Sequence, residues 1–289
     1  MVIRKTLVFI VLLVMASVAV FAATEEKLFI KARKVSAREL LKVVARFSNQ
    51  NIVVAGPLAP VPVDVDQKEI SASEAIQLVA SQAGMVAFFR YGIWICSFPE
   101  ILTDQNQMVF SGKIEGTKWI SLDFLDADIR DIIRIVADHS DNKASSESKI
   151  RGNVSCRFEQ VLPEPALRAL TTACGYSCTV QDKTIFCEKK VIFKPRPRPL
   201  QNKSPEIAVS PDESALASSP VILQAIVTLG DKRCARFSRP DTVRGFLAPG
   251  GKLDEIYSIR EILFDEVLME DTRTGKKCRI SFDKPLQSE

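Results

Sequence analysis

The chain has 289 residues, seven cysteines, a single histidine and a formal net charge of +4. It is too long for one small core and fits two or three domains of about 100 residues or fewer. The nearly balanced charge excludes the strongly basic or acidic chains that bind nucleic acid or acidic partners by charge alone. We therefore expect a multi-domain protein without a nucleic-acid partner.

Residues 1–22 have the pattern of a secretory signal peptide. Arg4 and Lys5 precede an apolar run from Thr6 to Val20, and Ala22 is a suitable small residue for cleavage. The alternative is an uncleaved inner-membrane anchor, because a run of about 18 apolar residues is borderline for spanning a bilayer. We expect cleavage after Ala22 and a periplasmic chain, which contacts the membrane only if the segment remains.

An internal repeat organises the next part of the chain. Segments 28–97 and 119–188 carry the same order of features, at an offset of about 91 residues. Each begins with an alternating strand pattern and continues into an amphipathic helix. Ser36 and Asp128 are the expected N-caps, and each has an acid three residues later that could complete a capping box.

Each repeat then continues with a central strand, a second helix and a closing hairpin. The second helices should end at Gly84 and Gly175, which permit a positive φ. The unit is therefore β-α-β-β-α-β-β, an α+β domain with two helices on one face of a small sheet. One element differs: Ile52–Ala55 is a clear strand, whereas residues 144–148 have little strand propensity and should form a short strand or none.

The opening of the second repeat, Ile120–Ile132 (ISLDFLDADIRDI), resembles the small periplasmic domain shared by secretins and TonB-dependent receptors. Arg151–Val154 and the Ala- and Leu-rich second helix also fit the layout of this short N-terminal (STN, N0-like) domain. The resemblance covers both repeats. It implies a periplasmic module that works by contact with other proteins in secretin rings, type IV pilus machines and receptor signalling.

We place these two domains at residues 27–98 and 118–190, with a linker at 99–117. Residues 191–220 form a second linker, rich in Pro and Ser, in which Pro195–Pro199 should adopt an extended polyproline conformation. We interpret this segment as a tether. The alternative is a spacer that docks into a groove of a partner.

Residues 221–284 contain short strand patterns separated by turn signals, which predicts a small all-β domain. The strands around Gly250-Gly251 and the stretch Tyr257–Met269 resemble the β-domain of the pilus assembly lipoprotein and of the type II secretion clamp protein. In those families the β-domain contacts the periplasmic part of the secretin, so the resemblance implies a protein contact here as well.

No catalytic constellation is recognisable in the sequence. His139 is the one histidine, so a Ser-His-Asp or Cys-His arrangement is not available elsewhere in the chain. We expect His139 to be packed on the inward face of its helix. Gly250-Gly251 lacks the spacing of a phosphate-binding loop and is typical of a turn. We therefore expect no enzyme, no cofactor and no metal site.

The cysteines are the one group of residues with a chemical prediction. In an exported chain they can form disulfides, and an odd number leaves at least one thiol over. Around a two-residue turn at Asp182-Lys183, Cys178 and Cys187 fall directly opposite each other on adjacent strands. The candidate pairs are Cys178 with Cys187, Cys156 with Cys174, and Cys234 with Cys278, which leaves Cys96 over. The alternatives are buried reduced thiols or a zinc site, although the spacings fit no standard zinc pattern.

Two functions are consistent with these features. The first is a non-catalytic periplasmic scaffold or coupling component of a secretin-type machine, in type II secretion or type IV pilus assembly. Its partners would be secretin periplasmic domains, inner-membrane platform proteins or further copies of the chain. The alternative is a ligand-binding or signal-sensing module with a pocket between sheet and helices.

Overall fold

The computed structural model describes residues 26–56, 61–102, 110–111, 114, 118–145, 150–189, 221–238, 243–253, 256–282 and 284–288. The expected signal peptide, the Pro-rich linker and most of the linker at 99–117 lie outside these ranges. Within the described ranges, no helix is both long and apolar enough to cross a membrane.

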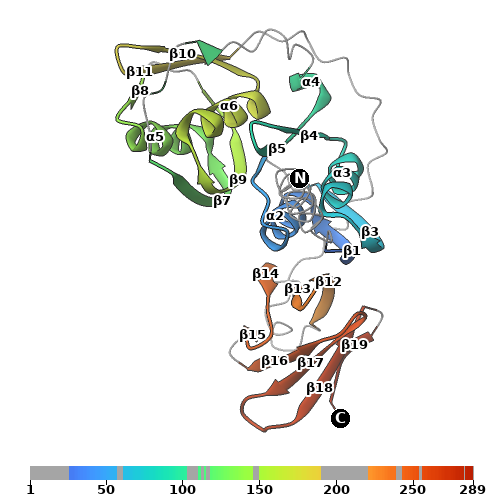
Figure 1. The fold of residues 1–289 in the computed structure, drawn as a ribbon. Coiled ribbons are helices and arrows are strands. Elements are labelled where there is room, and N and C mark those ends of the chain that lie inside the picture. Colours follow the sequence, from blue (N-terminus) through green and yellow to red (C-terminus); the bar gives the residue numbers. More distant parts are fainter. Residues whose placement is uncertain are drawn as a thin grey trace, which may run out of the picture.

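The element order of both repeats is the predicted one (Figure 1). The first consists of β1 (Leu28–Ser36), α2 (Ala37–Phe47), β2 (Ile52–Gly56), β3 (Pro62–Ile70), α3 (Ala72–Gln82), β4 (Val86–Arg90) and β5 (Ile93–Ser97). The second consists of β7 (Ile120–Asp128), α5 (Ile129–His139), β8 (Lys143–Ala144), β9 (Asn153–Val161), α6 (Pro163–Cys174), β10 (Tyr176–Gln181) and β11 (Thr184–Lys189). Between them lie α4 (Pro99–Leu102) and β6 (Phe110–Ser111). The weak strand expected in the second repeat, β8, has only two residues.

The two repeats also share irregular backbone positions. Lys34 and Asp126 both have a positive φ, and in each repeat the register of the strand pairing shifts there. Glu69 and Gln160 have a positive φ near the end of the central strand. One extra residue in a paired strand forms a β-bulge, which bends the strand locally. The repeat therefore extends from the sequence pattern to the detailed path of the backbone.

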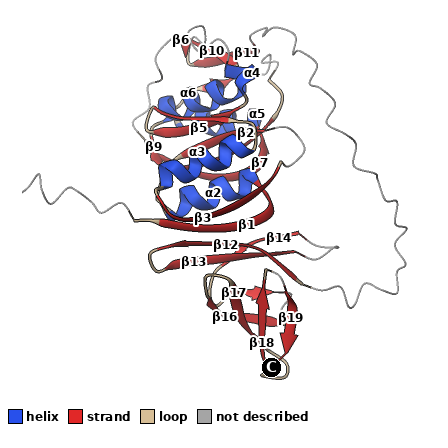
Figure 2. Ribbon diagram, turned by 90° about the vertical axis from the view of Figure 1, so that its right-hand side faces the viewer, coloured by secondary structure: helices blue, strands red, loops and turns tan. Residues whose placement is uncertain are grey.

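The helices of each repeat lie between two sheets, and the expectation that they cover one face of a single sheet was wrong. Figure 2 shows helix layers alternating with strand layers along the molecule. The reason is visible in α6, where Ala166, Leu167, Ala169 and Leu170 are all fully buried. Apolar residues spread over such a wide arc require cover on more than one side of the helix.

One sheet is shared by the two repeats. Its strand order is β4-β5-β2-β9-β7, and β2 pairs antiparallel with β9 from Ile52 opposite Arg157 to Gly56 opposite Asn153. Val54 faces the helices of the first repeat, and its neighbour Val53 faces those of the second. Burial on both faces explains why β2 is a continuous apolar run rather than an alternating one.

A second sheet joins the first repeat to the C-terminal part of the chain. Its order is β14-β13-β12-β1-β3, with β12 (Ile222–Leu229), β13 (Lys232–Ser238) and β14 (Val243–Leu247). Strand β12 pairs antiparallel with β1, from Leu28 opposite Leu229 to Ala32 opposite Ala225.

The remaining strands form a separate antiparallel sheet, so the prediction of an all-β C-terminal part is confirmed. They are β15 (Lys252–Leu253), β16 (Tyr257–Ile262), β17 (Glu266–Asp271), β18 (Lys277–Ser281) and β19 (Lys284–Ser288). Apolar residues of β12 and β13, such as Ile226 and Phe237, share a core with residues of this sheet, such as Ile259 and Val267. We call residues 221–288 the C-terminal unit.

Candidate protein-contact surfaces

Basic side chains on one face of α2 form ion pairs across the contact between the repeats. Arg38 forms an ion pair with Asp126 of β7. Asp123 of β7 pairs with Lys42 and, at 2.5 Å, with Arg46. Partial burial acts to raise the pKa of Asp123, but the bonds from Lys42 and Arg46 together lower this pKa below its ordinary value. The carboxylate is therefore held ionised at the boundary between two repeats.

The C-terminal unit is attached to the first repeat by more than backbone pairing. Arg236 of β13 forms a buried ion pair with Glu39 of α2, and burial lowers the pKa of the Arg236 guanidinium. Lys31 of β1 pairs with Asp265 at 2.6 Å. The ring of Phe29 meets that of Phe264 edge to face, with the centroids 5.1 Å apart.

Use of Glu39 in this contact changes the helix start. Ser36 is the N-cap of α2 but makes no side-chain cap bond, so the predicted capping box is not formed. A capping box is present instead at the start of α3, where Ser71 and Glu74 bond reciprocally and the backbone and hydroxyl of Ser71 lower the pKa of Glu74.

The helix start of the second repeat is simpler. Asp128 accepts a bond from the backbone N–H of Arg130 at 2.9 Å, as an N-cap should. The side chain of Arg130 also binds Asp128, and this bond is the main reason why the pKa of Asp128 is low. Asp131 pairs with Arg134 at 3.1 Å rather than closing a capping box. Both members of that pair are well exposed.

Strand β7 is covered less completely than its counterpart β1. Alignment on the shared bulge places Leu122 of β7 with Ile30 of β1, and Ile30 is fully buried whereas Leu122 is half-buried. Leu125, at the bulge of β7, is 49% exposed, and Trp119, the residue before β7, is 63% exposed. Among the described residues β7 pairs with β9 on one side and with no strand on the other.

The opposite edge of the shared sheet is β4. Val86 and Phe89 of this strand are 43% and 56% exposed, so apolar side chains also lie at this edge. Phe89 is supported by the ring of Trp94 at a centroid distance of 5.5 Å. The two edges of one sheet thus provide two apolar margins that can be tested against each other.

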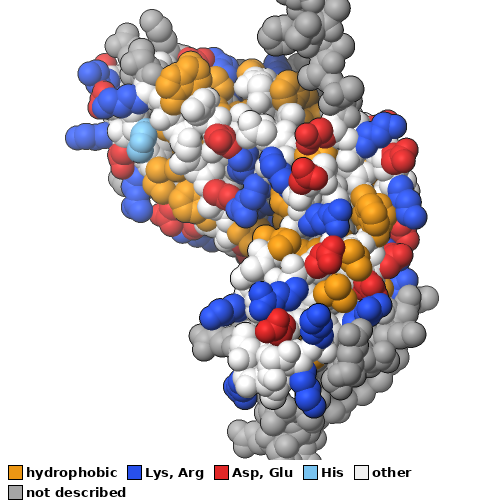
Figure 3. Space-filling model, turned by 60° about the horizontal axis from the view of Figure 1, so that its bottom comes forward, with side chains coloured by type: hydrophobic (Ala, Val, Ile, Leu, Met, Phe, Trp, Pro, Cys, Tyr) orange, Lys and Arg blue, Asp and Glu red, His pale blue; other side chains and the backbone are white. Residues whose placement is uncertain are grey.

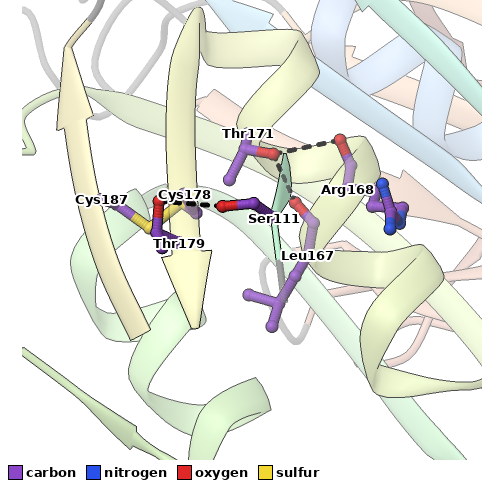
Figure 4. Close-up of a disulfide and its surroundings, with 7 residues drawn as sticks. All are labelled: Ser111, Leu167, Arg168, Thr171, Cys178, Thr179 and Cys187. Atoms are coloured by element: carbon purple, nitrogen blue, oxygen red, sulfur yellow. Dashed lines mark hydrogen bonds between the residues drawn. A yellow bond between two sulfur atoms is a disulfide. The ribbon is translucent and has the colours of Figure 1, made fainter. Parts of the chain in front are cut away.

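The disulfide predicted between Cys178 and Cys187 is present (Figure 4). The two residues face each other on β10 and β11 in the predicted register, with the Cα atoms 4.2 Å apart. The linker strand β6 pairs in parallel with β10 beside it, and Ser111 bonds to the hydroxyl of Thr179 at 3.2 Å. The bridge therefore fixes the outermost hairpin of the second repeat.

The other two predicted pairs are not formed. Cys234 faces the core of the first repeat from β13, whereas Cys278 lies on β18 of the separate C-terminal sheet. Cys156 belongs to the core of the second repeat and Cys174 packs against this core, but both remain free thiols. Cys96, expected to be left over, is free and fully buried. Burial is the main cause that raises the pKa to about 12 in a set of four free thiols: Cys96, Cys156, Cys174 and Cys234.

His139 does not lie on the inward face of its helix, so that prediction was wrong. The buried stripe of α5 includes Ile132, Ile133, Val136 and Ala137, and His139 at the last position is exposed. His139 is exposed although it lies three residues after the buried Val136, because it is the last residue of the helix. Among the described residues no group of three His, Cys, Asp or Glu side chains is arranged to hold a metal ion.

On the face of the molecule shown in Figure 3, charged side chains of both signs intermix, in keeping with the balanced composition. The space between helices and sheets, where a sensing module would need a pocket, is filled in the first repeat by fully buried side chains such as Leu40, Ile76 and Val54. Exposed apolar residues lie at both edges of the shared sheet, at Leu125 beside β7 and at Val86 and Phe89 of β4.

Sequence reasoning missed the contacts between the units, although a signal was present. Arg38, Lys42 and Arg46 are spaced four residues apart, so they lie on one side of α2. Alignment of the repeats places the acids Asp123 and Asp126 where the first repeat has lysines. A charge reversal at aligned positions indicates that the two strands face different neighbours.

Comparison of the chain with protein-family models, with curated proteins and with solved structures finds no match.

Proposed function

We propose that the chain is a non-catalytic periplasmic scaffold or coupling component of a secretin-type machine, in type II secretion or type IV pilus assembly. The observation that carries this proposal is the way the repeats bind their neighbours. The first repeat accepts β9 at β2 and β12 at β1, so its sheets are extended on two sides by strands from outside the repeat. Strand addition to an open sheet edge is a common mode of protein recognition.

The C-terminal unit supports the same proposal. The resemblance in the sequence implies that such a β-domain contacts the periplasmic part of a secretin. In this chain the corresponding contact is made internally, between β12 and β1 and through the ion pair of Arg236 with Glu39. The C-terminal unit thus makes a protein contact of its own within this chain, which supports a contact role for it.

The buried free thiols argue against nucleophilic catalysis by these cysteines. A nucleophilic cysteine needs a low pKa and access to solvent. Cys96, Cys156 and Cys234 are buried, and burial raises the pKa of each to about 12. They fit a structural role in the cores of a protein that acts by contact.

The test is affinity capture from cell-envelope extracts with a tagged chain, after mild cross-linking and with identification by mass spectrometry. We expect to recover a secretin through its periplasmic domains, or an inner-membrane platform protein. A tagged, unrelated exported protein of similar size is the control. Recovery of neither partner above that control, with the chain itself present in the extract, would contradict the proposal.

A further inference from the structure

We propose that the outer edge of β7 is a docking site for a β-hairpin of another polypeptide, bound as β12 and β13 are bound to the first repeat. The inference rests on the contact role proposed above, but it does not depend on which machine the chain serves. It follows from comparing the same strand in the two repeats.

The first repeat provides the template. Strand β1 is lined on its outer edge by β12 over five residue pairs, from Leu28 opposite Leu229 to Ala32 opposite Ala225. Val227 lies opposite Ile30, and both face the helices of the repeat. With this strand in place Ile30 and Ala32 are completely buried.

In the second repeat the equivalent position beside β7 holds no strand among the described residues. The aligned residues Leu122 and Phe124 pack against the core but stay half-buried. Leu125 and Trp119 are exposed beside them. A row of backbone N–H and C=O groups at such an edge is a template for pairing with another strand. The edge therefore has both the polar and the apolar parts of a strand-addition site.

The template also defines the chemistry of the partner. By analogy with Val227 and Ala225, the incoming strand needs a β-branched residue opposite Leu122 and a small residue opposite Phe124. Its second strand should carry an arginine, because Asp131 of α5 aligns with Glu39, which binds Arg236. Asp131 now pairs with Arg134, and both side chains are more than half exposed, so this pair can be exchanged at small cost.

A second copy of the chain is not the expected occupant. Its β12 is already paired with its own β1 and buried on both faces. A unit on the same chain also has a higher effective concentration at its own site than a separate molecule has, which favours docking within the chain. The partner is therefore a different polypeptide that carries a free hairpin of this kind.

The test uses a synthetic hairpin of residues 221–238 carrying Cys234→Ser as the probe, added to the purified chain. Iodide quenching of tryptophan fluorescence is the readout. Trp119 is 63% exposed and the other tryptophan, Trp94, only 7%. We expect the hairpin to protect Trp119 from iodide in a saturable way, because it covers the start of β7.

Variants at the two edges locate the site. Ser121→Lys combined with Leu125→Lys adds two charges at β7 and should weaken hairpin binding by at least about tenfold, or roughly 1.4 kcal/mol. Val86→Lys adds a charge at β4, the other edge of the same sheet, and should leave binding unchanged. Circular dichroism verifies that each variant is folded.

The arginine provides a second, independent measurement. A hairpin with Arg236→Ala should bind about threefold to tenfold more weakly to the chain, and Asp131→Asn in the chain should have a similar effect. The two changes together should cost little more than either alone, because they remove the same contact.

Several outcomes would overturn the inference. One is no saturable protection of Trp119, and another is an equal loss of binding in the Val86→Lys variant. Release of the native C-terminal unit without protection of Trp119 would place the hairpin at β1 instead. The assay contains no secretin, so failed envelope capture together with hairpin binding at β7 would reject the proposed machine and retain this site.

Discussion

The closing hairpins of the two repeats have the same place in their units but different surroundings. In β5 every residue is buried, whereas in β11 the aligned Phe186 is 40% exposed although Ile95 is completely buried. The difference arises because β5 lies between two helix layers, and β11 is covered on one face only. The same module is therefore an interior layer in one position and an outer layer in the other.

The elements packed around a repeat, rather than the fold of the repeat itself, therefore determine how far each of its residues is buried and how much it contributes to stability. Equivalent positions should respond very differently to the same substitution.

Ile95→Ala should lower the free energy of unfolding by about 4 kcal/mol, because it removes a fully buried side chain and leaves a cavity. The aligned Phe186→Ala should cost only about 1 kcal/mol, since much of that ring is already in solvent. Urea unfolding followed by circular dichroism gives both values. Similar losses for the two variants would show that the shared sheet is not buried on both faces.

Glu39→Gln should cost roughly 3 kcal/mol, because it leaves the buried guanidinium of Arg236 without a counter-charge. Hydrogen exchange should become faster in β12 and β1 before it changes elsewhere. Asp131→Asn at the aligned position of the second repeat is the control, and should alter stability by less than about 0.5 kcal/mol. Unchanged protection of β12 in the Glu39 variant would argue against this ion pair as an anchor.

Removing the disulfide by the double substitution Cys178→Ser and Cys187→Ser should cost about 2 kcal/mol, because the bridge closes a short loop. The exchange of β10, β11 and β6 should increase most. Under denaturing, non-reducing conditions five of the seven cysteines should react with a thiol reagent. Seven reactive thiols would contradict the bridge.

Asp123 should make the free energy of unfolding depend on pH in the acidic range. Its pKa is lowered in the folded protein, so its contribution is present above the ordinary carboxyl pKa of about 4 and disappears as the pH falls through the lower, folded value. Asp123→Asn should therefore be less stable than the parent at neutral pH, and the gap should narrow below about pH 4. Urea titrations at several pH values measure it. A gap that stays constant down to pH 2 would refute the assignment.

Local features of the fold could be predicted from the sequence. The strand and helix order depends on periodicity and on turn residues close in the chain, and Cys178 and Cys187 are set opposite each other by one short turn. The shared sheets could not be predicted in this way. A strand edge pairs through backbone groups, which carry no side-chain signal, so nothing in β1 by itself indicates that β12 will lie beside it.

The same lack of a local signal for contacts between distant parts of the chain explains two wrong predictions, the Cys234–Cys278 disulfide and the capping box at Glu39. Cys234 lies opposite Val227, and both residues face the core of the first repeat because β12 pairs with β1. Cys278 lies on β18 of the other sheet, so the two thiols are kept apart. Glu39 looked like part of a capping box because its true partner, Arg236, lies in a distant part of the sequence. The uninterrupted apolar run of Ile93–Cys96 was the clearest local sign that a strand is buried on both faces.

The pairing of β1 with β12 has a consequence for biosynthesis. A chain that emerges N-terminus first, from the ribosome or from an export channel, exposes β1 early, and β12 emerges only after the whole second repeat. Until β12 has emerged, the outer edge of β1 is unpaired, and an unpaired strand edge is prone to pair with other chains. Shortening the chain from its C-terminus would therefore damage the earliest-made domain.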